Sequence, residues 1–196
     1  MQSLGKLQKN FLRFTAVNCW HENDFESAAM WSLYLKSNEG IAIQTTFSKL
    51  KKSIIDKETV YIGRIRYIDY ENEIIESTYN FFNSVLLKRK SYEHEREIRA
   101  VVVKWPIVEK NDDESPSASP NQEDNNDNLG KMDLLGAPST VGNGIEIQVD
   151  VDELVENIFI APSAPYWFLN VVKNVCIKYG YDFNITKSSL NDSPIY

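Results

Sequence analysis

The sequence predicts one folded domain of α/β or mixed α+β class, with helices packed on a central mixed sheet and one long disordered acidic insertion. Segments with strand and helix periodicity alternate through most of the chain. The 196 residues are 42% hydrophobic, which is enough for one sizeable core. The charge is concentrated in a single polar stretch. We therefore expect 1–108 and 144–196 to fold together, with 109–143 as a disordered insertion between them.

The insertion is predicted from its composition. Residues 109–128 contain seven acidic residues and one lysine, and Ala118 is their only apolar residue apart from proline. Such a segment cannot bury enough apolar surface to offset its chain entropy. It carries six of the seven net negative charges, so the folded part is close to neutral. The acidity of the chain therefore gives no reason to exclude an anionic ligand.

The part before the insertion predicts short alternating elements. Met30, Leu33 and Tyr34 share one face at helical spacing, and Thr46 can cap a second helix. In chain order the expected elements are a strand at 14–18, a polar turn at 21–24, a helix at 26–36, a strand at 41–45, a helix at 47–55, a strand-rich segment at 59–70, a helix at 75–90 and a strand at 95–105.

The part after the insertion predicts shorter units. A helix should end at Gly180, because glycine adopts the left-handed conformation that closes many helices. The expected elements are a strand at 145–149, a helical turn at 152–156, a strand at 157–161, an amphipathic helix at 164–179 and a strand at 181–186.

The densest polar cluster begins the strand at 95–105. Side chains alternate along a strand, so Glu95, Glu97 and Arg99 should share one face. Two carboxylates about 7 Å apart suit general acid–base catalysis, metal binding or a grip on ribose hydroxyls. We interpret Glu95 and Glu97 as candidate catalytic residues. The alternative is an ordinary ion network that neutralises them.

Two arginines form a second pair on one face. Arg64 and Arg66 can hold a phosphate or carboxylate group, as can Arg99. Alternatively, Arg64 and Arg66 face solvent or neutralise the glutamates across the sheet, which would weaken a catalytic interpretation.

The turn and helix at 21–34 hold the remaining candidates. Trp31 and Tyr34 lie one helical turn apart and can stack on a flat ligand, although ordinary core packing explains them as well. His21 can act as a general base, or it is simply a surface residue of a polar turn.

Several classes of function lack support in the sequence. No metal-binding spacing of cysteines and histidines, phosphate-binding glycine loop or serine nucleophile motif occurs, so we expect no metal site and leave the cofactor open. The basic run 88–90 fits a helix C-terminus better than a nucleic-acid surface. No apolar stretch is long enough for a membrane span or a signal peptide. We expect a cytoplasmic protein that binds neither membranes nor nucleic acid.

Several short motifs, taken in order, resemble a known family. The chain resembles the prokaryotic family catalogued as domain of unknown function 2971 over about 14–190, the insertion apart. Because members carry a further segment before the Cys-Trp strand, the resemblance implies an N-terminally shortened, bacterial version with no assigned activity. The motifs are Cys19-Trp20, 26–34, 40–43, 67–70, 90–99, Pro162, Trp167-Phe168 and Ser189-Leu190.

Three functional hypotheses follow. The first is an enzyme that acts on a nucleotide-like or sugar-phosphate substrate. Its E-x-E pair is similar to that of mono-ADP-ribosyltransferases, which would imply NAD, but the arginine-bearing first strand and Ser-Thr-Ser strand of those enzymes are missing. The second is a non-catalytic module that binds a protein partner, accessory to defence or a mobile element. The third, a nuclease, requires E-x-K where Glu97-Ile98-Arg99 stands.

Overall fold

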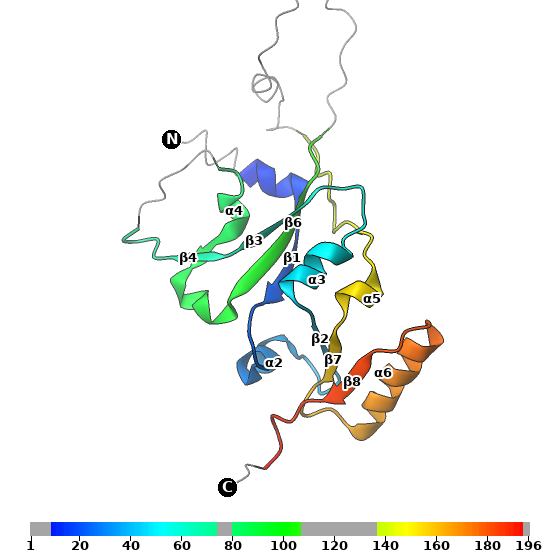
Figure 1. Ribbon diagram of the computed structural model, residues 1–196. Coiled ribbons are helices and arrows are strands. Elements are labelled where there is room, and N and C mark those ends of the chain that lie inside the picture. Colours follow the sequence, from blue (N-terminus) through cyan, green and yellow to red (C-terminus); the bar gives the residue numbers. More distant parts are fainter. Residues whose placement is uncertain (1–8, 74–79, 107–136, 194–196) are drawn as a thin grey trace, which may run out of the picture.

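The computed structural model describes residues 9–73, 80–106 and 137–193 (Figure 1). Helices and strands alternate along these residues, with η marking the two short 3₁₀ helices. The elements are η1 (Leu12–Phe14), β1 (Thr15–His21), α2 (Ala28–Tyr34), β2 (Ile41–Gln44), α3 (Phe47–Ser53), β3 (Val60–Arg64), β4 (Arg66–Ile68), α4 (Asn83–Leu86), β5 (Leu87–Arg89), η2 (Lys90–Glu95), β6 (Glu97–Val103), α5 (Val151–Leu154), β7 (Asn157–Ile160), α6 (Tyr166–Lys178) and β8 (Asn184–Lys187).

The first sheet is antiparallel and has β6 at its centre, between β1 and β3. The central strand is the most apolar, and its Val101 is 1% exposed. Val101 packs in a cluster with Phe11, which precedes η1, and with Val85 of α4. A central strand has both edges paired, so its side chains are held in register by two neighbours. The residues at the start of β6 are therefore firmly positioned.

The second sheet is mixed, with the order β2-β7-β8. β2 runs antiparallel to β7, and β8 runs parallel to it. Parallel neighbours need a crossover connection, and α6 provides it. Ile158, Ile160 and Ile185 form the centre of a second core, against which α6 packs Phe168 and Val172. Gly180, at φ +85°, closes this helix as the sequence predicts.

Contacts around two short helices join the two sheets. α3 and α5 lie side by side between them (Figure 1). The Asp150 amide donates to the Ser53 carbonyl oxygen at 2.7 Å, and an isolated bridge pairs Ile54 with Val149. Ser53 is fully buried, and its hydroxyl donates to the Leu50 carbonyl oxygen. A third sheet consists of the two parallel strands β4 and β5 and lies beside the first sheet.

The predicted mixture of helices and strands is confirmed, although the strands are divided among three small sheets. Several elements differ from the prediction. Of the helix predicted at 75–90, residues 75–79 lie outside the described residues. The rest contains only the single turn α4, because the chain then becomes extended as β5. The predicted strand at 145–149 is reduced to the bridge at Val149. The strand predicted from 95 begins at Glu97.

The predicted insertion at 109–143 lies mostly outside the described residues, since these resume at 137. The end of the predicted segment packs on the folded part. The Thr140 hydroxyl donates to the Lys104 carbonyl oxygen, its amide donates to the Arg13 carbonyl oxygen at 3.3 Å, and Val141 is buried. Residues 137–143 therefore belong to the ordered structure, because backbone carbonyls of other segments satisfy their polar groups.

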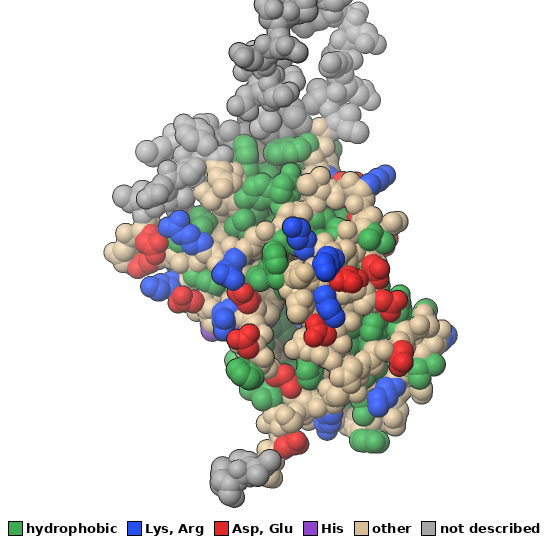
Figure 2. All heavy atoms as spheres, in the orientation of Figure 1, with side chains coloured by type: hydrophobic (Ala, Val, Ile, Leu, Met, Phe, Trp, Pro, Cys, Tyr) green, Lys and Arg blue, Asp and Glu red, His purple; other side chains and the backbone are tan. Residues whose placement is uncertain are grey.

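The surface in view carries both signs of charge. Figure 2 shows acidic and basic side chains interspersed over one face of the molecule. In the described residues, no helix is both long and apolar enough to cross a bilayer.

The second core makes a direct prediction about stability. Ile160 is completely buried, whereas Ile177 on α6 is 69% exposed. Ile160→Ala should lower the free energy of unfolding by about 2–5 kcal/mol, because it removes buried methyl groups and leaves a cavity. The matched Ile177→Ala should change it by less than about 0.5 kcal/mol. Urea unfolding of both variants measures the difference, and equal losses would contradict the packing of β7.

Candidate functional site

A left-handed residue separates the two candidate glutamates. Glu95 ends η2, Glu97 begins β6, and Arg96 between them has φ 41° and ψ 55°. This conformation is uncommon for a residue other than glycine. Glu95 therefore does not continue the strand as predicted. Both carboxylates nevertheless reach the same cation, because the turn brings Glu95 back over the start of β6.

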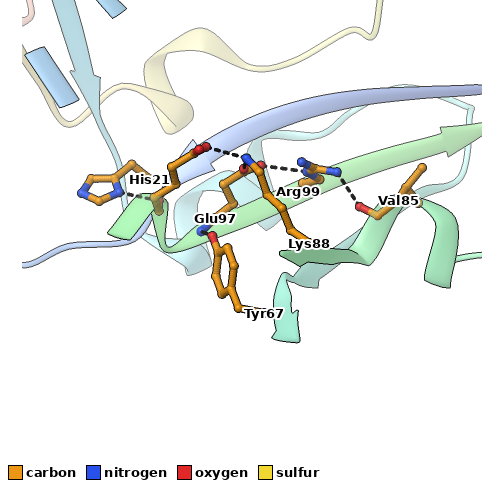
Figure 3. A network of polar contacts seen from close by, with 7 residues as sticks. His21, Tyr67, Val85, Lys88, Glu97 and Arg99 are labelled. Carbon is orange, nitrogen blue, oxygen red and sulfur yellow. Dashed lines mark hydrogen bonds and ion pairs between the residues drawn. The ribbon is translucent and has the colours of Figure 1, made fainter. Parts of the chain in front are cut away.

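That cation is Lys88 of β5. Its Nζ donates to Glu95 Oε2 at 2.7 Å and to Glu97 Oε1 at 2.5 Å. The second oxygen of Glu97 accepts a hydrogen bond from Arg99 Nε at 2.8 Å. Figure 3 shows that Lys88 and Arg99 approach Glu97 from different strands. The glutamates are thus held by a lysine inside a segment that the sequence predicts as helix.

Neighbouring backbone groups anchor this network. Arg99 Nη1 donates to the Val85 carbonyl oxygen at 2.6 Å, and the Glu97 amide donates to Tyr67 Oη at 2.8 Å (Figure 3). Gly63 lies opposite Arg99 on β3. A Cβ at Gly63 would lie 2.9 Å from Leu86 Cδ1, so glycine lets α4 approach the sheet closely enough for Val85 to reach Arg99.

The charge state of Glu97 follows from these contacts. Glu97 is 4% exposed and Glu95 is 8% exposed. Burial by itself would raise the pKa of Glu97, but hydrogen bonds from Arg99 and Lys88 outweigh it and lower the pKa to about 2. Although burial opposes its charge, Lys88 has a raised pKa because both glutamates accept its hydrogen bonds. Glu97 is therefore ionised at neutral pH and cannot serve as a proton donor there.

Both glutamates line a cavity of about 410 Å³. Residues from β1, α2, β2 and β7 complete its wall. The lining includes His21, Trp31 and Tyr34 from the predicted set, together with Cys19, Trp20, Asn23, Phe25, Glu26, Ser27, Met30, Leu35, Ile41, Ala42, Ile43, Gln44, Thr45 and Phe159. The structure thus brings five of the eight predicted site residues to one cavity.

His21 lies opposite Glu97 at the end of β1. Its Nδ1 is 2.7 Å from the Glu95 carbonyl oxygen. A carbonyl oxygen only accepts, so Nδ1 carries the hydrogen. Nε2 is buried without a hydrogen-bond partner among the described residues. His21 therefore fixes the backbone of Glu95 instead of lying free in a surface turn.

Trp31 and Tyr34 form the aromatic part of the wall, on α2. The Ser27 side chain caps this helix by accepting from the Met30 amide. Trp31 also packs against the second core, and its Nε1 donates to Glu26 Oε2 at 3.0 Å. Trp31 therefore packs on the second core, as one of the two alternatives has it, and also lines the cavity. Tyr34 is 66% exposed.

Arg64 and Arg66 do not reach the glutamates. Arg64 pairs with Glu22 at 2.5 Å and Arg66 with Glu73 at 3.5 Å, and both side chains are largely exposed. β3 ends at Arg64, and Arg66 begins a strand that pairs with β5 instead. The two arginines therefore do not form the predicted pair opposite Glu95 and Glu97, and Lys88 and Arg99 neutralise these glutamates in their place.

Cys19 is a cavity residue that the sequence analysis did not select. It lies opposite Arg99 in the pairing of β1 and β6, on the same face as His21. Burial raises the pKa of the Cys19 thiol, and the nearby Arg99 charge opposes this effect. The predicted strand ends at residue 18, whereas β1 continues to His21. Alternation of Cys19 with His21 along that longer strand is the signal that could have identified it.

These features define a mixed α/β protein with an aromatic cavity that contains a neutralised pair of glutamates. Within the described ranges, no three histidine, cysteine, aspartate or glutamate side chains lie together as a metal site requires. No family model, no curated protein and no solved structure matches this chain.

The lowered pKa of Glu97 predicts acid sensitivity. Its folded pKa of about 2 lies below the ordinary value of 4.5, so ionised Glu97 stabilises the fold at neutral pH. This contribution is lost as the pH falls from 4.5 toward 2. Glu97→Gln should therefore lose less thermal stability over that range than the parent, as measured by Tm against pH. The control Glu146→Gln, at an exposed position, should follow the parent. If the Tm of Glu97→Gln fell with pH as steeply as that of the parent, this account would be contradicted.

Proposed function

We propose that the protein is an enzyme that acts on a nucleotide-like or sugar-phosphate substrate in this cavity. The observation that carries the proposal is the position of Glu95 and Glu97 in the same lining as Trp31 and Tyr34. A flat group can stack on the aromatic side chains while hydroxyl groups bind the carboxylates. The cavity volume of about 410 Å³ is in the range of small-molecule sites.

Glu97 has the role of a permanently charged group. Each of its carboxylate oxygens accepts one hydrogen bond from Lys88 or Arg99. A carboxylate has about four lone-pair sites, so it can still accept bonds from substrate hydroxyls. The charge of Glu97 would also stabilise the positive charge that develops at a sugar carbon when the bond between that carbon and a leaving group breaks. Glu95, bound to the same lysine, would be the second acceptor.

The other candidates receive more limited roles. His21 is a positioning residue, because its hydrogen bond holds the Glu95 backbone and its Nε2 is buried. Arg99 is engaged by Glu97 and the Val85 carbonyl oxygen, so it orients the glutamate. Arg64 and Arg66 do not line the cavity, and we assign no part of the substrate to them.

The alternative is a non-catalytic binding module, accessory to defence or a mobile element. The observation in its favour is that Lys88 and Arg99 form ion pairs with the two glutamates, as in a structural ion network. The resemblance to the uncharacterised prokaryotic family stays a prediction, and it is consistent with either function. We further propose a cytoplasmic location, which is supported by two free cysteine thiols.

A ligand screen coupled to turnover tests the enzyme proposal. Thermal shift with nucleotides, NAD and sugar phosphates should identify a stabilising ligand, whose conversion is then followed by chromatography. Glu97→Gln should lower kcat by about 10²-fold or more while the ligand still binds, since it removes the charge and keeps the shape. The Glu146→Gln variant is the control. Ligand binding without conversion by the parent would favour the binding module, and full activity of Glu97→Gln would refute the assigned role.

A further inference from the structure

The cavity lining has a one-sided charge. Among the described residues that form it, Glu26, Glu95 and Glu97 are acidic and none is a lysine or arginine. Lys88 and Arg99 hold the glutamates but do not belong to the lining. A ligand inside the cavity therefore faces carboxylates before it faces the cations behind them.

The aromatic wall is preorganised next to these carboxylates. The hydrogen bond from Trp31 Nε1 to Glu26 Oε2 fixes the indole ring. A carboxylate that accepts this hydrogen also increases the electron density of the ring, which strengthens its attraction for a cation. Tyr34, one helical turn further along α2, adds a second ring. Aromatic rings beside carboxylates form the kind of site that recognises organic cations.

The charges around the Tyr34 hydroxyl are consistent with a negative field at this wall. Burial raises the pKa of its hydroxyl, and the charges of Glu95 and Glu97 raise it further, whereas Lys88 opposes them. The two glutamates thus act on Tyr34 in spite of their ion pairs with Lys88.

We propose that the cavity binds a flat organic cation, a pyridinium-like or protonated heterocyclic ring, against Trp31 and Tyr34. The inference rests on the proposed function in that it names the part of the substrate that enters the cavity. A phosphate group of the same substrate would lie outside the carboxylate-lined interior. Arg96, outside the lining, is a cation next to it, because its Nη1 donates to Asn23 Oδ1 of the lining at 3.2 Å.

Isosteric probes test this inference on the full chain. Calorimetry would compare an N-methylpyridinium carboxamide cation with its neutral isostere toluamide and with the toluate anion. The cation should bind at least about 5-fold more tightly than the neutral ring, as expected for a desolvated cation–aromatic contact, and the anion should bind most weakly. Tyr34→Leu and Glu26→Gln should each reduce this preference. Tyr166→Leu, which removes an exposed tyrosine of α6, should leave it unchanged.

The outcomes separate this inference from the proposed function. Equal affinities for the cation and the neutral ring would overturn the inference, whereas turnover of a sugar phosphate in the screen above would leave the enzyme proposal standing. If the cation binds equally well to Tyr34→Leu and Glu26→Gln, its site lies elsewhere on the protein. That result would also overturn the inference. A Tm equal to that of the parent would show that both variants are folded.

Discussion

The Lys88 ammonium group, held between two buried carboxylates, is the interaction on which the rest of the site depends. It contacts Glu95 and Glu97 at 2.7 and 2.5 Å. Two carboxylates buried side by side would repel each other and take up a proton. Lys88 places one positive charge against both carboxylates, and Arg99 places a second against Glu97. The lysine therefore determines the charge of the cavity wall as well as the geometry of the turn around Arg96.

The distribution of strands explains why this group lies beside a cavity. β6 is the centre of the first sheet, and β1 beside it carries Cys19 and His21 on the face that also holds Glu97. The chain then leaves β1 for α2, which packs Trp31 against the core of the second sheet. The cavity is lined from both sheets and from the helix that connects them. His21 and Glu97 of its lining come from the first sheet, and its apolar residues come largely from α2 and β2.

Part of this arrangement could be predicted from the sequence. Alternation along 97–103 correctly places Glu97 and Arg99 on one face, and Thr46 caps α3 as expected. Glu95 could not be placed, because only tertiary contacts favour the left-handed conformation of Arg96. Lys88 was missed for a related reason: its helical pattern is overridden by pairing of β5 with β4 and by the attraction of two glutamates. Arg64 and Arg66 have the right spacing for a pair, but a strand boundary separates them.

A double-mutant cycle between Lys88 and Glu97 tests the central claim most directly. Lys88→Met alone should reduce the free energy of unfolding by about 3 kcal/mol or more, because it leaves two buried carboxylates with one cation. Adding Glu97→Gln should recover part of that loss, so the double variant should be more stable than the sum of the single effects by at least about 1 kcal/mol. Additivity of the two effects within about 0.5 kcal/mol would contradict the account, because it would mean that Lys88 does not hold Glu97.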